Sequence, residues 1–257
     1  MIINNNISAI NTRNQLFNTN AAASKSMEKL SSGKRINRAA DDAAGLSISE
    51  KMRAQIRGLN QAARNAQDGI SLIQTAEGAL DEVSNMLVRL KELAVQKANG
   101  TYNDKDKENL KLEMTSLTDE ITNIFNNTKF NGSTVLKSAA TIVISDNGTT
   151  TLVIGATPTN GITSLNSSSS VTDIETAIEN VNKARATYGA KQNRLESTVR
   201  NLKTTAENLQ AAESRIRDTD MAEEMSTFTK NNILIQAGTA MLAQANMQPQ
   251  SVLSLLR

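Results

Sequence analysis

The chain has 257 residues, with 28 Lys and Arg against 26 Asp and Glu, so its net charge is only +2 at pH 7. This balance argues against a protein that binds nucleic acid or an anionic membrane nonspecifically. The sequence contains no Cys and no His, which excludes disulfides, thiolate chemistry and most zinc or copper sites. Without a recognisable catalytic, cofactor-binding or metal-ligating motif, we expect a protein that is not an enzyme and that needs no cofactor.

The N-terminal residues carry only a weak helical pattern. Residues 1–6 show neither a basic region nor an apolar segment, so we expect no cleavable secretory signal, and no apolar stretch is long enough for membrane insertion. Polar residues such as Asn14 interrupt the apolar stripe that follows, formed by Ile3, Ile7, Ile10, Phe17 and Ala21.

A long helix is predicted next. From Ile56 to Ala94, apolar residues recur at spacings of three and four, which indicates a coiled-coil helix. Asn99-Gly100 then marks a turn, and the same spacing from Leu110 to Ile124 predicts a shorter helix that folds back.

The middle of the chain differs in kind. The apolar runs 141–144 and 151–154 flank Asp146-Asn147-Gly148, a pattern that predicts a small β-hairpin. Pro158, Gly161 and four consecutive serines indicate a flexible connector after it. We expect this segment to be an exposed insert outside the helical seams.

Helical periodicity returns after Thr172-Asp173, a plausible N-cap, and continues to Ile216 with spacings of four and three. The fold class predicted from these seams is mainly α: a long antiparallel coiled coil or helical-bundle rod with a small β-hairpin insert.

The C-terminal stripe is again weak, because Asn232 and Thr239 interrupt it. Two half-polar terminal helices bury too little apolar surface to offset the entropy of ordering them. We therefore expect the two termini to pair as helices that become ordered on assembly. The candidate packing residues of the C-terminal stripe are Met221, Met225, Phe228, Ile235 and Leu242.

Longer motifs identify a family. The segment 30–46, LSSGKRINRAADDAAGL, and the segment 71–80, SLIQTAEGAL, resemble the signatures of bacterial flagellins. The same holds for AESRIRD at 212–218 and for the closing residues 248–257. The resemblance covers roughly residues 1–137 and 173–257.

This resemblance implies a structural subunit that polymerises into the flagellar filament for swimming motility. It implies an inner terminal domain (1–44 plus 218–257), a helical rod domain (45–137 plus 173–217) and a short variable exposed insert (138–172). It also implies an extracellular filament protein, exported without a cleavable signal. In the inner domain, the resemblance implies that the two terminal helices pair as an inner coiled coil. The implied partners are further copies of the chain, an export chaperone, the filament cap, hook-associated proteins and the vertebrate Toll-like receptor that senses flagellin. The C-terminal stripe from Met221 to Leu242 supplies the implied chaperone-contact candidates.

Two groups of residues are candidates for specific contacts. Arg89, Leu93 and Glu113 match flagellin positions that contact neighbouring subunits and the Toll-like receptor, although periodicity alone favours ordinary helix surface. Charged residues near the predicted junction of inner and rod domains are candidates for an interdomain joint whose charges match between the two chain segments. These residues are Lys34, Arg35, Arg38, Asp41, Asp42, Asp218 and Asp220.

Two alternative functions remain open from the sequence. A hook–filament junction protein has similar helical termini but is incorporated in few copies. A cytoplasmic coiled-coil binding module would instead have termini that fold in isolation and would form a small discrete oligomer.

Overall fold

The computed structural model of the chain describes residues 6–157 and 161–255, and for residues 249–255 it describes only the helical backbone. Ile3 of the predicted N-terminal stripe and Pro158 of the predicted connector lie outside the described residues, as does the end of the closing motif, 256–257.

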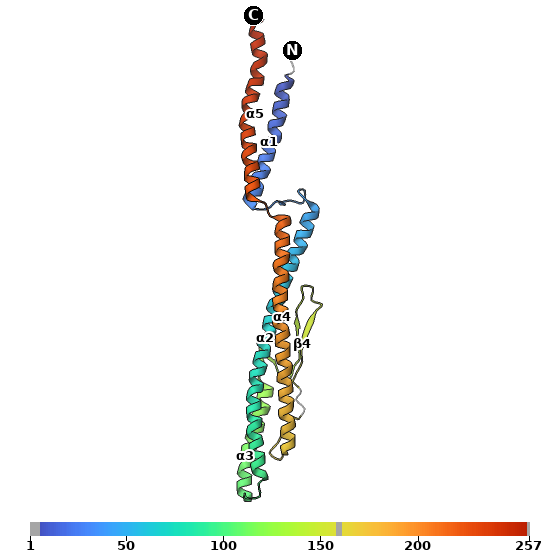
Figure 1. The fold of residues 1–257 in the computed structure, drawn as a ribbon, viewed down its shortest axis with the longest axis vertical. Coiled ribbons are helices and arrows are strands. Elements are labelled where there is room, and N and C mark those ends of the chain that lie inside the picture. The colour runs from blue at the N-terminus through green and yellow to red at the C-terminus, as the bar shows by residue number, and fades with distance from the viewer. Residues whose placement is uncertain (1–5, 158–160, 256–257) are drawn as a thin grey trace. The chain divides into compact units, whose positions relative to one another are not determined.

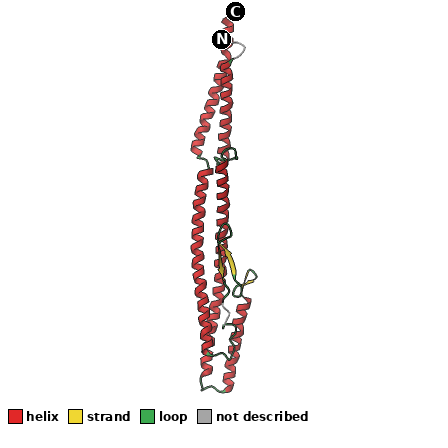
Figure 2. Cartoon of the chain, turned by 90° about the vertical axis from the view of Figure 1, so that its right-hand side faces the viewer, coloured by secondary structure: helices red, strands yellow, loops and turns green. Residues whose placement is uncertain are grey.

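Most of the described chain is helical (Figure 1). The helices are α1 (Ile7–Ser32), α2 (Ala43–Ala98), α3 (Asp104–Asn127), α4 (Val171–Arg217) and α5 (Met221–Leu255). Two small antiparallel strand pairs follow α3 (Figure 2): β1 (Lys129–Phe130) with β2 (Ser133–Thr134), and β3 (Ala140–Val143) with β4 (Thr151–Ile154). This content confirms the predicted mainly α fold with a small β insert.

The chain forms two compact units. The terminal unit contains residues 1–54 and 209–257, and the central unit contains residues 55–208. None of the helices in the described ranges has both the length and the apolar character that a membrane span requires.

In the central unit, α2 packs against α3 and α4 through continuous apolar seams. Ion pairs join Asp81 to Arg185 at 3.0 Å and Lys91 to Glu175 at 2.9 Å, so α2 and α4 run antiparallel. The side chains at the centre of the seams are fully buried, among them Leu80, Leu87, Leu90, Met114, Ile121, Val181 and Leu195. The predicted antiparallel helical bundle is therefore confirmed.

The predicted hairpin at β3 and β4 forms, but our expectation that its segment lies outside the seams is wrong for its apolar side chains. Leu152, Ile154, Ile162 and Leu165 are all buried in the same core as α2 and α4. The alternating strand β4 points Leu152 and Ile154 inward, whereas Val153 is 49% exposed.

Polar and backbone contacts also hold this hairpin in place. The Asn65 side chain donates a hydrogen bond to the Val143 carbonyl. A Cβ atom on Gly58 would lie 2.9 Å from the Cβ of Asp146, so the α2 backbone and the hairpin turn approach closely there.

In the terminal unit, α1 and α5 lie side by side and run antiparallel. At one end the Asn6 side chain donates to the Ala245 carbonyl, 2.7 Å away, and at the other Lys29 pairs with Glu224 at 3.3 Å. Asn6 also caps α1, since its side chain accepts from the Ala9 N–H. The predicted pairing of N- and C-terminal helices is confirmed.

Candidate assembly surface on the terminal helices

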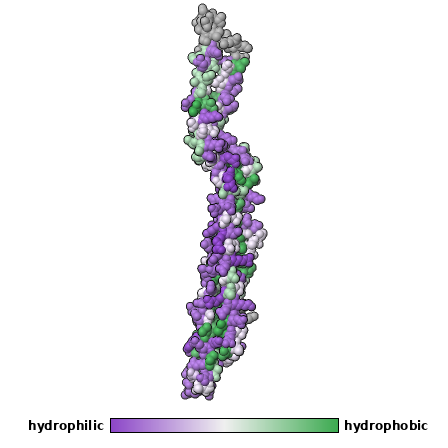
Figure 3. Space-filling view, viewed as in Figure 1, coloured by the Kyte–Doolittle hydropathy of each residue, from purple (hydrophilic) through white to green (hydrophobic). Residues whose placement is uncertain are grey.

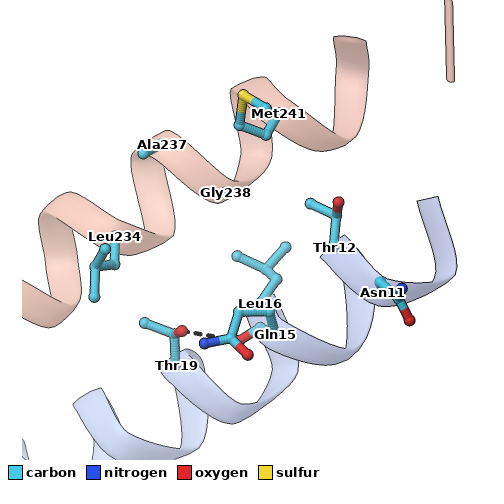
Figure 4. Close-up of a pocket in the computed structure, with 9 residues that line it drawn as sticks. All are labelled: Asn11, Thr12, Gln15, Leu16, Thr19, Leu234, Ala237, Gly238 and Met241. Atoms are coloured by element: carbon cyan, nitrogen blue, oxygen red, sulfur yellow. Dashed lines mark hydrogen bonds between the residues drawn. The ribbon is translucent and has the colours of Figure 1, made fainter. Parts of the chain in front are cut away.

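The contact between α1 and α5 is narrow. Of the α1 side chains, the buried ones are Thr19, Ala23 and Ser26, all small. Beside the contact lies an open hollow of about 480 Å³, and Figure 4 shows Leu16 and Thr12 of α1 facing Leu234, Gly238 and Met241 of α5 across it. Two helices that meet through so few buried side chains leave most of their apolar surface uncovered.

The uncovered surface of α5 is apolar on several sides. From Asn231 to Leu255 the helix contains no charged residue. Within the described side chains of this stretch, Ile233 is 60% exposed and Met241 is 62% exposed. Figure 3 shows hydrophobic patches among weakly polar residues over this helix pair. A helix without a charged face, whose apolar side chains are exposed on more than one side, is typical of one that becomes buried on more than one side.

Helix α1 adds to this apolar surface. Its exposed large side chains are Ile7 (62%), Ile10 (44%), Phe17 (74%) and Met27 (57%). The same helix pair thus carries exposed large apolar side chains on both of its helices, more than isolated surface residues would require.

The predicted tail residues divide into two groups. Phe228, Ile235 and Leu242 are partly buried, and their spacing of seven places them on the side of α5 that carries the α1 contacts. Met221 and Met225 are instead 48% and 49% exposed. Sequence periodicity missed the exposed residues on the other sides, namely Ile233, Leu234, Met241 and Met247, and the signal that would have found them is the absence of charge after Lys230.

The predicted joint residues lie in two segments that meet, but they meet mainly through backbone atoms. Lys34 and Asp218 form an antiparallel bridge, and the Arg35 N–H donates to the Arg217 carbonyl at 2.7 Å. The Arg35 guanidinium also donates to the Ile216 carbonyl at 2.6 Å.

The charges in this region are matched differently from our expectation. Among the described residues, no ion pair joins Lys34, Arg35 or Arg38 to Asp218 or Asp220. The Arg35 side chain reaches across to the Ile216 carbonyl, whereas Arg38 and Asp41 pair with residues of the preceding helix α1. Asp42 and Asp220 instead cap the helices that follow them. Arg38 pairs with Glu28, Asp41 pairs with Lys25, Asp42 caps α2 at Gly45, and Asp220 caps α5 at Ala222 and Glu223.

Asp41 is the most strongly perturbed of these acids. The Lys25 ammonium lies 2.8 Å from its carboxylate, and the Arg38 and Asn37 N–H groups also donate to it. The hydrogen bond from Lys25 is the largest cause that lowers the pKa of Asp41 to about 2, followed by the bond from Arg38. Asp41 therefore stays ionised and keeps the loop 37–41 closed at neutral pH.

The three predicted contact residues of the central unit differ in their exposure to solvent. The Arg89 guanidinium donates two hydrogen bonds to Glu113 on α3, at 2.9 and 3.0 Å, and one to Glu92. Arg89 and Glu113 are both about half-exposed. Leu93 is only 1% exposed, so its role as a surface contact does not agree with the structure. It widens the apolar seam of α2 beneath the Arg89–Glu113 pair.

Comparison with known proteins gives consistent relatives. The models of the bacterial flagellin N-terminal and C-terminal helical regions match residues 3–141 and 171–256. Flagellin from Bacillus subtilis is 49% identical over 304 residues, and flagellin from Halalkalibacterium halodurans is 52% identical over 273 residues. Both alignments cover all of this chain and all of the relative.

A spirochaete relative and a solved structure extend this result. Flagellin FlaB2 of Treponema pallidum is 46% identical over 286 residues, again with full coverage of both chains. A crystal structure of Bacillus cereus flagellin matches with a TM-score of 0.50 and 36% identity, covering 58% of this chain and 94% of that one. These relatives confirm the predicted filament protein and do not favour the junction-protein alternative, and the chain belongs to the bacterial flagellin family.

Proposed function

We propose that this chain is a subunit of the bacterial flagellar filament and that α1 and α5 supply the surface on which neighbouring copies pack. The observation that carries the proposal is the charge-free helix α5, whose apolar side chains point to several sides while α1 covers only one. Burial of such side chains is the dominant favourable term in most protein association.

A second copy of the chain is the occupant that fits this surface. Family members that share the full length of this chain include proteins named filament core proteins, such as that of Treponema maltophilum. Each copy brings the same two apolar helices, so each exposed helix side finds a matching apolar side on a neighbour. Repetition of this contact produces a polymer instead of a closed pair.

The test compares two substitutions of exposed apolar residues. Ile233→Lys places a charge on the assembly surface, whereas Val153→Lys places one on the exposed side of β4, and both residues are about half-exposed in the monomer. We expect I233K to abolish polymerisation, measured by light scattering and electron microscopy, and V153K to polymerise as wild type. Normal filaments from I233K would exclude α5 as the packing surface.

The same proposal includes the predicted domain limits. An inner domain of residues 1–44 plus 218–257 becomes ordered on assembly, a helical rod domain contains 45–137 plus 173–217, and 138–172 is the short insert. The small number of buried side chains in α1 supports the dependence of the inner domain on its neighbours. Limited proteolysis tests it: we expect cleavage near both termini of the monomer and protection in the filament.

The joint residues align the two chain segments that lead into α2 and α5. Backbone pairing between residues 33–35 and 216–219 aligns the two chain segments, and the helix caps at Asp42 and Asp220 fix where α2 and α5 begin. These contacts hold α1 and α5 in register. Substitution of Asp220 by Ala removes one cap and is expected to weaken assembly, while substitution of the exposed Glu207 on α4 is the control.

Arg89 and Glu113 form a second proposed contact, for neighbouring subunits and for the vertebrate Toll-like receptor. An ion pair between exposed side chains contributes little to folding, so its substitution leaves the monomer stable. We expect Arg89→Ala to weaken receptor binding in surface plasmon resonance without a change in thermal unfolding. Unchanged binding would remove the pair from the contact.

The exposed apolar side chains of α5 also support the remaining proposed partners. Before assembly, the exposed side chains of α5 require protection from premature association. An export chaperone in the cytoplasm binds this helix, and the subunit then leaves the cell and joins a filament bounded by cap and hook-associated proteins. Truncation after Arg217 is expected to abolish chaperone binding in calorimetry, and retained binding would contradict this role.

A further inference from the structure

The exposed methionines of this chain are concentrated in the terminal unit. Met114 of the central unit is completely buried. By contrast, one methionine of α1 and four of α5 are between 48% and 62% exposed: Met27, Met221, Met225, Met241 and Met247. The flexible, polarizable side chain of methionine suits an adaptable apolar contact, but its sulfur is also open to oxidants.

We propose that the four exposed methionines of α5 are an oxidation site for peroxides, and that their oxidation state determines whether an unassembled subunit can enter the polymer. This inference rests on the proposed packing of copies through α1 and α5. It adds a modification site and a dependence on oxidants that the packing itself does not require.

The surroundings of Met241 show why its sulfur is accessible to a small oxidant. Its side chain is one of those that line the open hollow between α1 and α5, which Figure 4 shows as sticks. The Met241 side chain is 62% exposed. A small oxidant such as hydrogen peroxide can reach it without any opening of the fold.

The reaction balances without another reagent. A sulfur lone pair attacks one peroxide oxygen, the O–O bond breaks and an S–O bond forms. The sulfur loses two electrons and becomes a sulfoxide, and the second peroxide oxygen leaves as water after proton transfer. Methionine sulfoxide is reversible, because dedicated reductases return it to the thioether.

Oxidation changes the property on which assembly depends. The sulfoxide turns an apolar side chain into a polar one with a strong hydrogen-bond acceptor. Its burial against the apolar side chains of another copy costs the water that it loses, which is unfavourable. An assembled subunit, whose α5 is covered, is protected from the same reaction.

The experiment uses the full-length monomer treated with hydrogen peroxide, with mass spectrometry of each methionine peptide and measurement of the critical concentration for polymerisation. We expect Met221, Met225, Met241 and Met247 to be oxidised before the buried Met114. The critical concentration is expected to rise at least about tenfold, which corresponds to roughly 1.4 kcal/mol, and to return after reductase treatment.

A matched variant separates α5 from every other site. In M221L/M225L/M241L/M247L each thioether becomes an aliphatic chain of similar volume. We expect this variant to polymerise and to be much less sensitive to peroxide than wild type, with any remaining effect due to Met27 of α1, and the single variant M241L to show partial resistance. Oxidised wild type that assembles normally, or a quadruple variant that peroxide inhibits as strongly as wild type, would overturn the proposal.

The controls distinguish this inference from the proposed function. Normal polymerisation of unoxidised I233K contradicts the packing surface, whatever peroxide does. Loss of polymerisation in I233K together with peroxide-insensitive wild type contradicts only the oxidation site. In the oxidised full-length chain, thermal unfolding of the central unit is expected to be unchanged, because Met114 is completely buried and Met86 is partly buried against the core. An unchanged transition excludes general unfolding as the cause.

Discussion

Leu16 of α1 packs directly onto Gly238 of α5. A Cβ atom placed on residue 238 would lie 3.2 Å from the Cδ1 atom of Leu16, closer than most such contacts allow. Glycine thus permits the two helices to approach closely where Leu16 projects toward α5. The hollow lined by Met241 and Leu234 begins beside this contact.

Replacement of Gly238 by Leu is expected to separate α1 from α5, because two branched side chains cannot occupy the space of one. Hydrogen exchange of residues 7–32 and 221–248 should become faster, while exchange in the central unit stays unchanged. Gly238→Ala is the matched control, since its single methyl needs only a small shift of Leu16 and improves helix propensity. Equal exchange in G238L and wild type would show that this contact does not hold the pair together.

Substitutions of two neighbouring residues in α2 should show that buried seam residues stabilise the fold and exposed ones do not. Leu87 is completely buried and Val88, its neighbour, is 49% exposed. Leu87→Ala leaves a cavity and is expected to lower the free energy of unfolding by about 2–5 kcal/mol, whereas V88A should change it by less than about 0.5 kcal/mol. Thermal unfolding followed by circular dichroism measures both, and similar melting temperatures would remove Leu87 from the core.

The hairpin strand β4 offers an equally close pair. Ile154 is 1% exposed and Val153 is 49% exposed. Ile154→Asp buries an unpaired charge and is expected to cost more than about 3 kcal/mol, while Val153→Asp places its charge in water and costs little. Calorimetric unfolding of the two variants tests whether the hairpin belongs to the core of the central unit.

Acid should weaken the loop 37–41 through Asp41. Its pKa is lowered from 3.8 to about 2 in the folded chain, chiefly by the hydrogen bond from Lys25. A lowered pKa means that this stabilisation is fully present above about pH 4 and is lost as the pH falls through about 2. We expect the Asp41 carboxyl signal in NMR to titrate near pH 2, and the variant Asp41→Asn to lose this part of the acid dependence.

Much of the central unit could be predicted from the sequence, because its stability comes from regular seams. The spacing of three and four in residues 56–94 and 174–216 is sufficient to indicate two long helices and their antiparallel pairing. The burial of Leu152 and Ile154 could not be predicted in the same way. Their alternation with Thr151 and Val153 was readable, but local sequence does not say which element covers the inner side of a strand.

Only part of the candidate assembly surface could be predicted from the sequence, because periodicity identifies one side of a helix. Phe228, Ile235 and Leu242 follow the helical period and face α1, so a periodic search finds them. Ile233 and Met241 lie off that stripe, and a single-stripe search treats them as ordinary surface. Leu93 shows the opposite error: a match to family contact positions suggested a surface residue, whereas its burial depends on how α3 and α2 pack.

The turn of the larger hairpin is a position at which the chain can accept inserted sequence. Strands β3 and β4 pair from Ala140–Ile154 to Val143–Thr151, so the chain leaves and re-enters the core at neighbouring points. Asn147, Gly148 and Thr149 lie beyond this pairing and are exposed. A foreign peptide or a whole folded module spliced between them would have its ends held together by the strands, and loop-closure entropy grows only slowly with length. The position is suited to display of added sequence on every copy of a polymer.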